Sequence, residues 1–78
     1  MSTDILAGIG EVLREHLGWE GPVSADMRLV EDLRLDSVRL LTLAAEVENR
    51  FRVVLEEADE TAIVTVGDLV EVVRKKHG

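Results

Sequence analysis

Apolar residues recur at helical spacing in three segments of the chain. The first, over residues 4–17, predicts a helix that Gly18 ends. An Asp36-Ser37 pair opens the strongest segment, which ends around Phe51, and a third follows Thr65. The core-facing positions would be Ile5, Leu6, Ile9, Leu13 and Leu17 in the first segment, Leu40, Leu43, Ala44, Val47 and Phe51 in the second, and Val66, Leu69, Val70 and Val73 in the third.

A long connection, residues 18–36, separates the first two helices. Loops of this length in a small domain are functional or disordered unless they are anchored. Scattered apolar residues predict an ordered loop laid over the core, with Trp19 as an anchor and not a ligand platform. The proposed anchors are Trp19, Val23, Met27, Leu29, Val30, Leu33 and Leu35.

The region between the last two long segments is less regular. Residues 52–55 have strand propensity but no second strand to pair with, and residues 56–62 can form a short helical turn. Thr65 can cap the last helix, with Asp68 completing a weaker form of the capping box. The pattern therefore predicts an all-α fold, a small four-helix bundle with three longer helices, one short third helix and a long first loop. We expect one domain over residues 1–78.

Composition narrows the class of function. The net charge is −7 with 16 acidic and 9 basic residues, which argues against nucleic acid or an anionic membrane as a partner. No apolar run approaches the length of a membrane span, and no cysteine is present. A domain this small has little room to enclose an active site. We expect a soluble, cytoplasmic, monomeric protein whose role is to bind or carry another molecule and not to catalyse a reaction.

Candidate catalytic and metal-binding groups are weak. His16 and His77 stand at helix ends without partners at metal-ligand spacing, so we expect both to be solvated. Adjacent carboxylates such as Glu31-Asp32 have no apolar frame that would raise a pKa for acid–base work. We therefore predict no catalytic residue and no metal site.

Ser37 allows two interpretations. In the first, Asp36 or Ser37 is only the N-cap of the second helix. In the second, the Ser37 hydroxyl is an exposed site for a phosphodiester, beside helix amides that favour a phosphate. Ser37 is a poor hydrolytic nucleophile, because no histidine is placed to act as its base.

A second apolar row on the same helix comprises Val38, Leu41 and Ala45. It indicates either packing against a second neighbour or a docking strip for a partner protein. The rim of that strip would be Arg39, Thr42, Glu46 and Asn49.

The run Val30-Glu31-Asp32-Leu33-Arg34-Leu35-Asp36-Ser37-Val38, with the leucines and Phe51 that follow it, resembles the acyl carrier protein family. The resemblance covers nearly the whole chain. It implies that a phosphopantetheinyl transferase attaches 4′-phosphopantetheine, taken covalently from coenzyme A, to Ser37, with Asp36 as the recognition acid. The arm would hold acyl groups as thioesters. Further implied partners are an acyl-loading enzyme, either an adenylating ligase or an acyltransferase, and downstream synthase or tailoring enzymes.

Two residues depart from the family motif. Arg34 stands where the motif usually has Gly, and Val38 stands where it usually has Leu. Arg34 would contact the prosthetic phosphate or tune the choice of partner. Residues 38–52 carry a net charge of +1, whereas the acidity lies in residues 53–73. Fatty-acid-synthase carriers of the resembled family have a strongly acidic second helix, and charge complementarity steers partner choice, so we do not expect housekeeping fatty-acid enzymes as the main partners. The Leu-x-Leu-Asp-Ser-Val run at residues 33–38 resembles that of stand-alone carriers, which implies partners from polyketide or mixed peptide–polyketide pathways. Met1 and the short tails favour a free-standing carrier.

Two alternatives remain open at this point. One is an aminoacyl or peptidyl carrier of nonribosomal peptide synthesis. The other is a helical interaction module in which Ser37 serves only as an N-cap.

Overall fold

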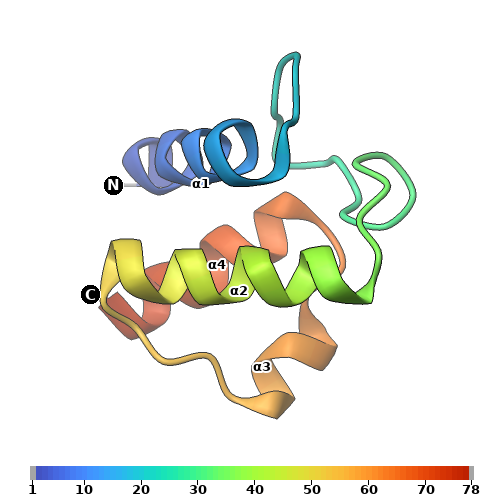
Figure 1. Ribbon diagram of the computed structural model, residues 1–78. Coiled ribbons are helices and arrows are strands. Elements are labelled where there is room, and N and C mark those ends of the chain that lie inside the picture. Colours follow the sequence, from blue (N-terminus) through green and yellow to red (C-terminus); the bar gives the residue numbers. More distant parts are fainter. Residues whose placement is uncertain (1, 78) are drawn as a thin grey trace.

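The structure is a computed structural model that describes the backbone of residues 2–77 and the side chains of residues 4–76. The described part contains four helices and no strand (Figure 1). The predicted all-α bundle is confirmed, whereas the prediction for His77 lies outside the described side chains. The helices are α1 (Ser2–Leu17), α2 (Ser37–Phe51), α3 (Glu57–Ala62) and α4 (Val66–His77).

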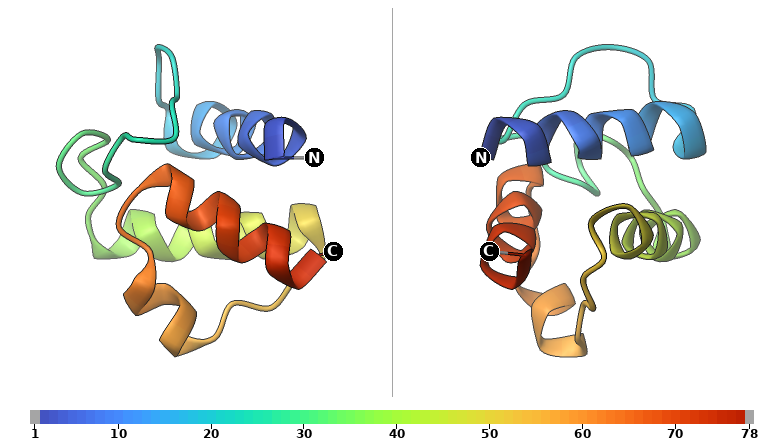
Figure 2. Two further views of the ribbon diagram at one scale, coloured as in Figure 1. Left: turned by 180° about the vertical axis from the view of Figure 1, so that it is seen from behind. Right: turned by 90° about the vertical axis from the view of Figure 1, so that its left-hand side faces the viewer.

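The three longer helices enclose one hydrophobic core. Helix α1 lies across one side of α2 and α4, and the short α3 lies on the opposite side (Figure 2). The predicted apolar faces of α1, α2 and α4 all contribute to this core. Removal of these side chains from water supplies the main stabilisation of the fold. The largest fully buried side chains are Ile9, Leu13, Val47, Val66 and Val73.

Gly8 allows α1 and α2 to approach closely. A Cβ atom at this position would lie 2.6 Å from Phe51 Cζ and 3.0 Å from Arg50 Nε. At Gly10 the nearest atoms to such a Cβ belong to Val23, at 3.9 Å. Both glycines reduce helix propensity, but only Gly8 is required by packing.

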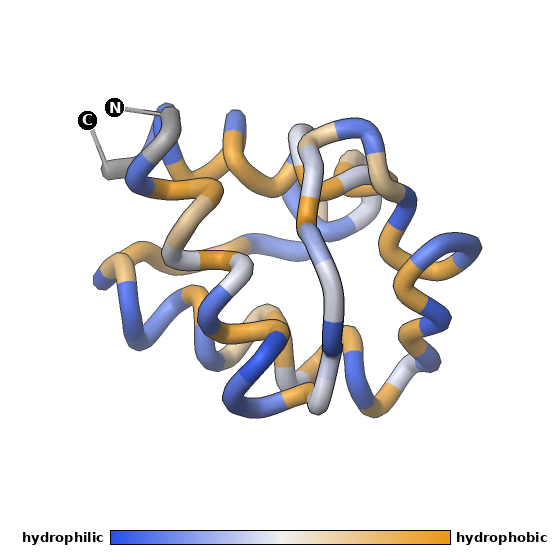
Figure 3. Tube along the Cα trace, turned by 90° about the horizontal axis from the view of Figure 1, so that it is seen from above, coloured by the Kyte–Doolittle hydropathy of each residue, from blue (hydrophilic) through white to orange (hydrophobic). Residues whose placement is uncertain are grey.

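The long loop is attached to the start of α4 by main-chain hydrogen bonds. Leu29 N donates to Val64 O at 3.0 Å, Val66 N to Met27 O at 2.9 Å, and Gly67 N to Ala25 O at 2.7 Å. The last two bonds use amides at the start of α4 that have no partner within the helix. The loop is therefore ordered although residues 18–26 are mostly neutral or hydrophilic (Figure 3).

Most of the predicted loop anchors are confirmed. Trp19 is half-buried against the core, and its indole N–H donates to Pro22 O at 3.2 Å. The prediction is wrong for Val30, whose side chain is 59% exposed. Its neighbour Leu29 takes the inward position instead. The inward-facing anchors are Leu29, Leu33 and Leu35, which are buried, and Trp19, Val23 and Met27, which are half-buried.

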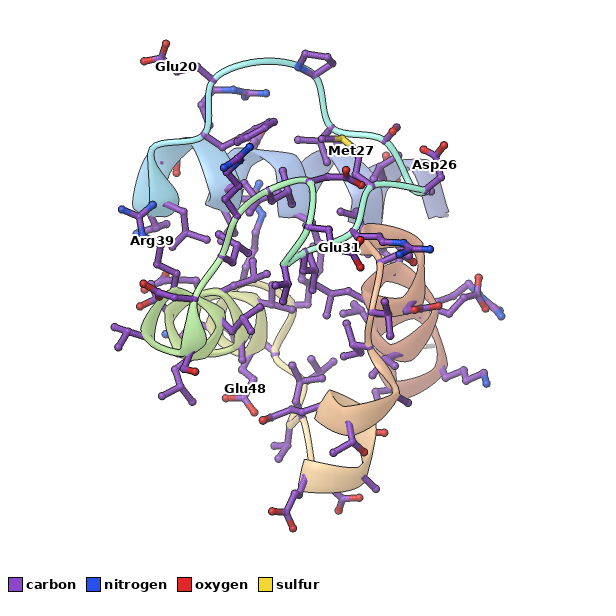
Figure 4. All side chains as sticks on the ribbon, turned by 90° about the vertical axis from the view of Figure 1, so that its right-hand side faces the viewer. Glu20, Asp26, Met27, Glu31, Arg39 and Glu48 are labelled. Carbon is purple, nitrogen blue, oxygen red and sulfur yellow. The ribbon has the colours of Figure 1, made fainter. Side chains whose placement is uncertain are left out.

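The segment after α2 is an ordered coil. Arg52 adopts a left-handed conformation (φ 57°) that ends α2, and Leu55 N donates to Glu48 Oε2 at 2.7 Å. The Glu48 carboxylate lies on the α3 side of α2 (Figure 4). Burial alternates over Val53 to Leu55 as in a strand, but no second strand in the described residues pairs with them.

The predicted cap of α4 is confirmed in full. Asp68 N donates to Thr65 Oγ1 at 3.1 Å, and Thr65 N donates to Asp68 Oδ2 at 3.0 Å. This is the reciprocal arrangement of a capping box.

Candidate functional site

Asp36 caps α2, and Ser37 is the first residue of the helix. The Asp36 backbone is extended (φ −90°, ψ −176°), and its Oδ1 accepts a hydrogen bond from Arg39 N at 2.9 Å. This settles which residue of the Asp36-Ser37 pair is the N-cap, because a cap accepts from the second or third helical amide. The Ser37 hydroxyl is therefore not needed to close the helix end.

The surroundings of Ser37 suit a phosphate ester. The side chain is exposed, so its Oγ can be reached by another protein. The first amides of a helix have no intrahelical partner. The Asp36 side chain accepts a hydrogen bond from the Arg39 amide. The amides of Ser37 and Val38 remain available beside the Ser37 hydroxyl. Such amides, together with the helix dipole, stabilise a bound anion.

A tight turn leads into this site. Leu33 N donates to Arg28 O and Leu35 N to Leu29 O, both at 3.1 Å, while Asp32 Oδ2 accepts from Arg28 N at 2.7 Å. The turn buries Leu33 and Leu35 and directs the following residues to the surface. Ser37 is thus presented by a structured element on one side and a helix on the other.

Arg34 occupies a left-handed conformation within this turn, with φ at 58°. L residues with a side chain are disfavoured there, whereas glycine is not. This explains physically why the resembled motif usually has glycine at this position. No described hydrogen bond or ion pair joins Arg34 to Ser37, so its expected contact with a prosthetic phosphate stays a prediction.

A groove of about 470 Å³ opens between α2 and α3 and reaches Ser37. Its wall on α2 and its floor are apolar, and its polar residues other than Ser37 belong to α3. A volume of this size can shelter a short chain of atoms. The groove is lined by Leu29, Ser37, Leu40, Leu41, Leu43, Ala44, Leu55, Glu57, Glu60, Thr61, Ile63 and Leu69.

The second apolar row of α2 faces solvent and not a neighbouring helix. Val38 is 70% exposed and Leu41 64% exposed, and Ala45 and Asn49 are also exposed. An exposed apolar row of this kind is available for contact with another protein.

The other residues of the expected rim contact the protein itself. Arg39 Nη1 donates to Leu17 O at 3.4 Å, and its side chain lies beside the end of α1 (Figure 4). Thr42 Oγ1 donates to Val38 O at 3.2 Å. Glu46 Oε1 lies 3.4 Å from His16 Nε2. The His16 side chain is exposed, as expected for a solvated histidine, and it lies beside this carboxylate.

Acid–base and metal chemistry find no support among the described residues. The carboxyl groups with a resolved pKa shift are all more acidic than usual. Hydrogen bonds from Ser24 Oγ, Glu56 N, Val64 N and the Arg74 guanidinium lower the pKa of Asp26, Asp59, Asp68 and Glu71, respectively. A general acid at neutral pH needs the opposite shift.

No group of three or more described His, Asp or Glu side chains could hold a metal ion. No described helix has the length and apolar character to cross a membrane.

Comparison with known proteins agrees with this geometry. A family model described as "Phosphopantetheine attachment site" matches residues 7–73. An acyl carrier protein of Thermotoga maritima is 36% identical over 76 residues, which cover 96% of this chain and 94% of the relative. The meromycolate extension acyl carrier protein of Mycobacterium tuberculosis is 32% identical over 73 residues, and the match spans 64% of that relative's length.

A solved structure shows the same fold. It is a candidate acyl carrier protein of Mycobacterium tuberculosis that superposes with a TM-score of 0.85 at 30% sequence identity. The match covers 91% of this chain and 96% of that one.

Proposed function

Because this chain belongs to the acyl carrier protein family, whose members hold 4′-phosphopantetheine covalently and are carriers and not enzymes, we propose that Ser37 is its attachment residue. The observation that carries this proposal is the cap of α2. Asp36 closes the helix end, which leaves the exposed Ser37 hydroxyl available for a phosphodiester.

The residues at the end of α2 suit the attachment chemistry. Ser37 Oγ would displace adenosine 3′,5′-bisphosphate from coenzyme A and form the ester to phosphate, while a transferase residue takes the hydroxyl proton. The amides of Ser37 and Val38 would then face the ester phosphate. When bound, the group supplies a thiol that holds acyl groups as thioesters. The chain has no cysteine, so this would be its only thiol.

The groove between α2 and α3 supports a role in sheltering the cargo. It reaches Ser37 and is mostly apolar, so an acyl chain that enters it is removed from water. The protein would protect its thioester from hydrolysis in this way and release it when a partner enzyme docks.

We propose that partner enzymes contact the exposed apolar row of α2. The four charged side chains of this helix all contact other parts of the protein. Arg39 donates to Leu17 O, Glu46 lies beside His16, Glu48 accepts from Leu55 N, and Arg50 pairs with Glu11. A transferase or loading enzyme that approaches Ser37 would meet an apolar strip more than a charged one. That strip consists of Val38, Leu41 and Ala45, and its rim of Arg39, Thr42, Glu46 and Asn49.

This distribution of charge favours a carrier of specialised metabolism, in a polyketide or related pathway. We expect that carrier to be cytoplasmic. A partner selected by a strongly acidic second helix would find little to bind here. The mycobacterial relatives are named for meromycolate extension, which is consistent with a carrier that serves dedicated chain-building enzymes.

The direct test is intact mass after incubation with coenzyme A and a promiscuous phosphopantetheinyl transferase. We expect the protein to gain one phosphopantetheine group and the Ser37→Ala variant to gain none. Addition to the variant, or none to the parent, would refute the assignment. Competition between acyl and aminoacyl loading enzymes would then distinguish an acyl carrier from an aminoacyl carrier.

A further inference from the structure

The two walls of the groove differ in charge. The α2 wall is formed by Leu40, Leu41 and Ala44, all uncharged, whereas α3 contributes Glu57, Glu60 and Thr61. The two glutamates stand one turn apart on the same short helix. An acyl chain in the groove would thus lie between a hydrocarbon surface and a pair of carboxylates.

These two carboxylates are not neutralised by a neighbour. Neither Glu57 nor Glu60 forms an ion pair with a described side chain. The cation that reaches α3 is Lys76, and its Nζ pairs with Asp59 Oδ2 at 2.9 Å. The negative potential of the two glutamates therefore acts on whatever occupies the groove.

We infer that Glu57 and Glu60 select the cargo by the charge at its far end: the groove accepts acyl chains that end in a methyl group or an amine and disfavours chains that end in a carboxylate. The inference rests on Ser37 as the attachment residue. It concerns only the preference of this groove among acyl groups of equal length.

Electrostatics and burial act together in this preference. A terminal carboxylate beside two like charges is repelled, and it also loses its hydration when it approaches an apolar wall. A terminal ammonium is attracted to the same carboxylates while its methylene chain contacts the leucines. Because both glutamates are exposed, water and salt weaken the effect.

The test compares three chains of equal length on the phosphopantetheine arm: hexanoyl, 6-aminohexanoyl and adipoyl. Each is transferred from its coenzyme A thioester, and loading is verified by intact mass. Hydroxylamine, which is uncharged, then cleaves the thioesters. The cleavage rate of each loaded protein is divided by that of the same acyl group on free pantetheine, which removes the intrinsic reactivity of the chain.

For the parent protein we expect the hexanoyl and aminohexanoyl thioesters to be cleaved about two- to fivefold more slowly than the adipoyl thioester, after the division by the free pantetheine rates. This factor corresponds to the interaction energy of exposed charge pairs. The Glu57→Gln/Glu60→Gln variant should lose most of this difference. Glu15→Gln/Glu20→Gln is the matched control: it removes the same net charge at exposed positions on α1 and in the loop and should keep the difference. Figure 4 shows Glu20 at the end of the molecule opposite α3.

Equal protection of all three chains in the parent would overturn the inference, and so would an unchanged difference in the Glu57→Gln/Glu60→Gln variant. These outcomes are separate from a failure of the proposed function. If no phosphopantetheine mass is gained at Ser37, the attachment proposal fails at the loading step. If mass is gained and all chains are protected alike, only the selectivity fails.

Discussion

The Asp36 carboxylate accepts a hydrogen bond from the Arg39 amide at 2.9 Å, and this bond gives the two residues of the Asp36-Ser37 pair different tasks. Asp36 stabilises the start of α2. Ser37 is left with an exposed hydroxyl at the same helix end. The alternative in which Ser37 is only a cap therefore has a measurable consequence.

We predict that Ser37→Ala changes the free energy of unfolding by less than about 0.5 kcal/mol, as expected for an exposed residue without a bonding role. Asp36→Ala should cost about 1 kcal/mol, because it removes the cap. Urea unfolding followed by circular dichroism measures both. A larger loss for Ser37→Ala than for Asp36→Ala would show that the serine is the cap.

Asp36→Asn separates capping from recognition by charge. Asparagine caps as well as aspartate, so we predict nearly parental stability. If a transferase reads the Asp36 charge, phosphopantetheine attachment to this variant slows although its fold is intact. Attachment rates followed by intact mass test this point, with Glu20→Gln as a control that removes one exposed charge elsewhere in the loop. An unchanged rate would leave Asp36 with capping alone.

The left-handed conformation of Arg34 predicts an order of stability. Arg34→Gly and Arg34→Ala both remove the cation, but only glycine tolerates a φ of 58° without strain. We expect the glycine variant to be more stable than the alanine variant by about 1 kcal/mol. Thermal unfolding of the pair measures this difference, and equal stability would contradict the strain argument.

Gly8 and Gly10 should respond to alanine in opposite directions. At Gly8 the new Cβ would lie 2.6 Å from Phe51 Cζ, so overpacking outweighs the gain in helix propensity and costs a net of about 1–2 kcal/mol. At Gly10 the nearest atoms lie at 3.9 Å, and the helix should gain about 0.5–1 kcal/mol. Stabilisation by both substitutions would show that α1 and α2 can separate at Gly8.

Asp68 should make stability depend on acidic pH. Hydrogen bonds from the amides of Val64 and Thr65 lower its pKa below the ordinary value of 3.8. A carboxyl that is more acidic in the folded state stabilises the fold above its unfolded pKa, and this contribution is lost as the pH falls through the folded pKa. We expect the melting temperature to decrease as the pH is lowered below about 4. The decrease should be smaller in the Asp68→Asn variant. A carboxyl NMR titration that finds a raised pKa would contradict this.

The helices could be predicted from the sequence because their signals are local. The apolar stripes, the Thr65–Asp68 capping box and the stop at Gly18 each lie within a few residues. The expected second helix, from Asp36-Ser37 to about Phe51, is therefore close to the observed Ser37–Phe51. The outward row of Val38 and Leu41 was visible as a second stripe for the same reason.

The features that the sequence did not predict depend on distant partners. The exposure of Val30 could not be predicted because the hydrogen bond from Leu29 N to Val64 O helps to set which loop side chains face inward. The pairing of His16 with Glu46 joins residues 30 positions apart. The acidic wall of the groove appears only when α3 lies beside α2, although Glu57 and Glu60 are plain in the sequence.

The bonds from Ala25, Met27 and Leu29 to residues 64–67 also bear on the order of events during synthesis. The segment that leads into Ser37 completes its hydrogen bonding only after residues 64–67 have left the ribosome. Until then the loop that precedes Ser37 lacks its attachment to the start of α4. We expect a nascent chain to be a poor substrate for modification, so the time at which the prosthetic arm is added would be set by the arrival of the last helix and not by the translation of the serine itself.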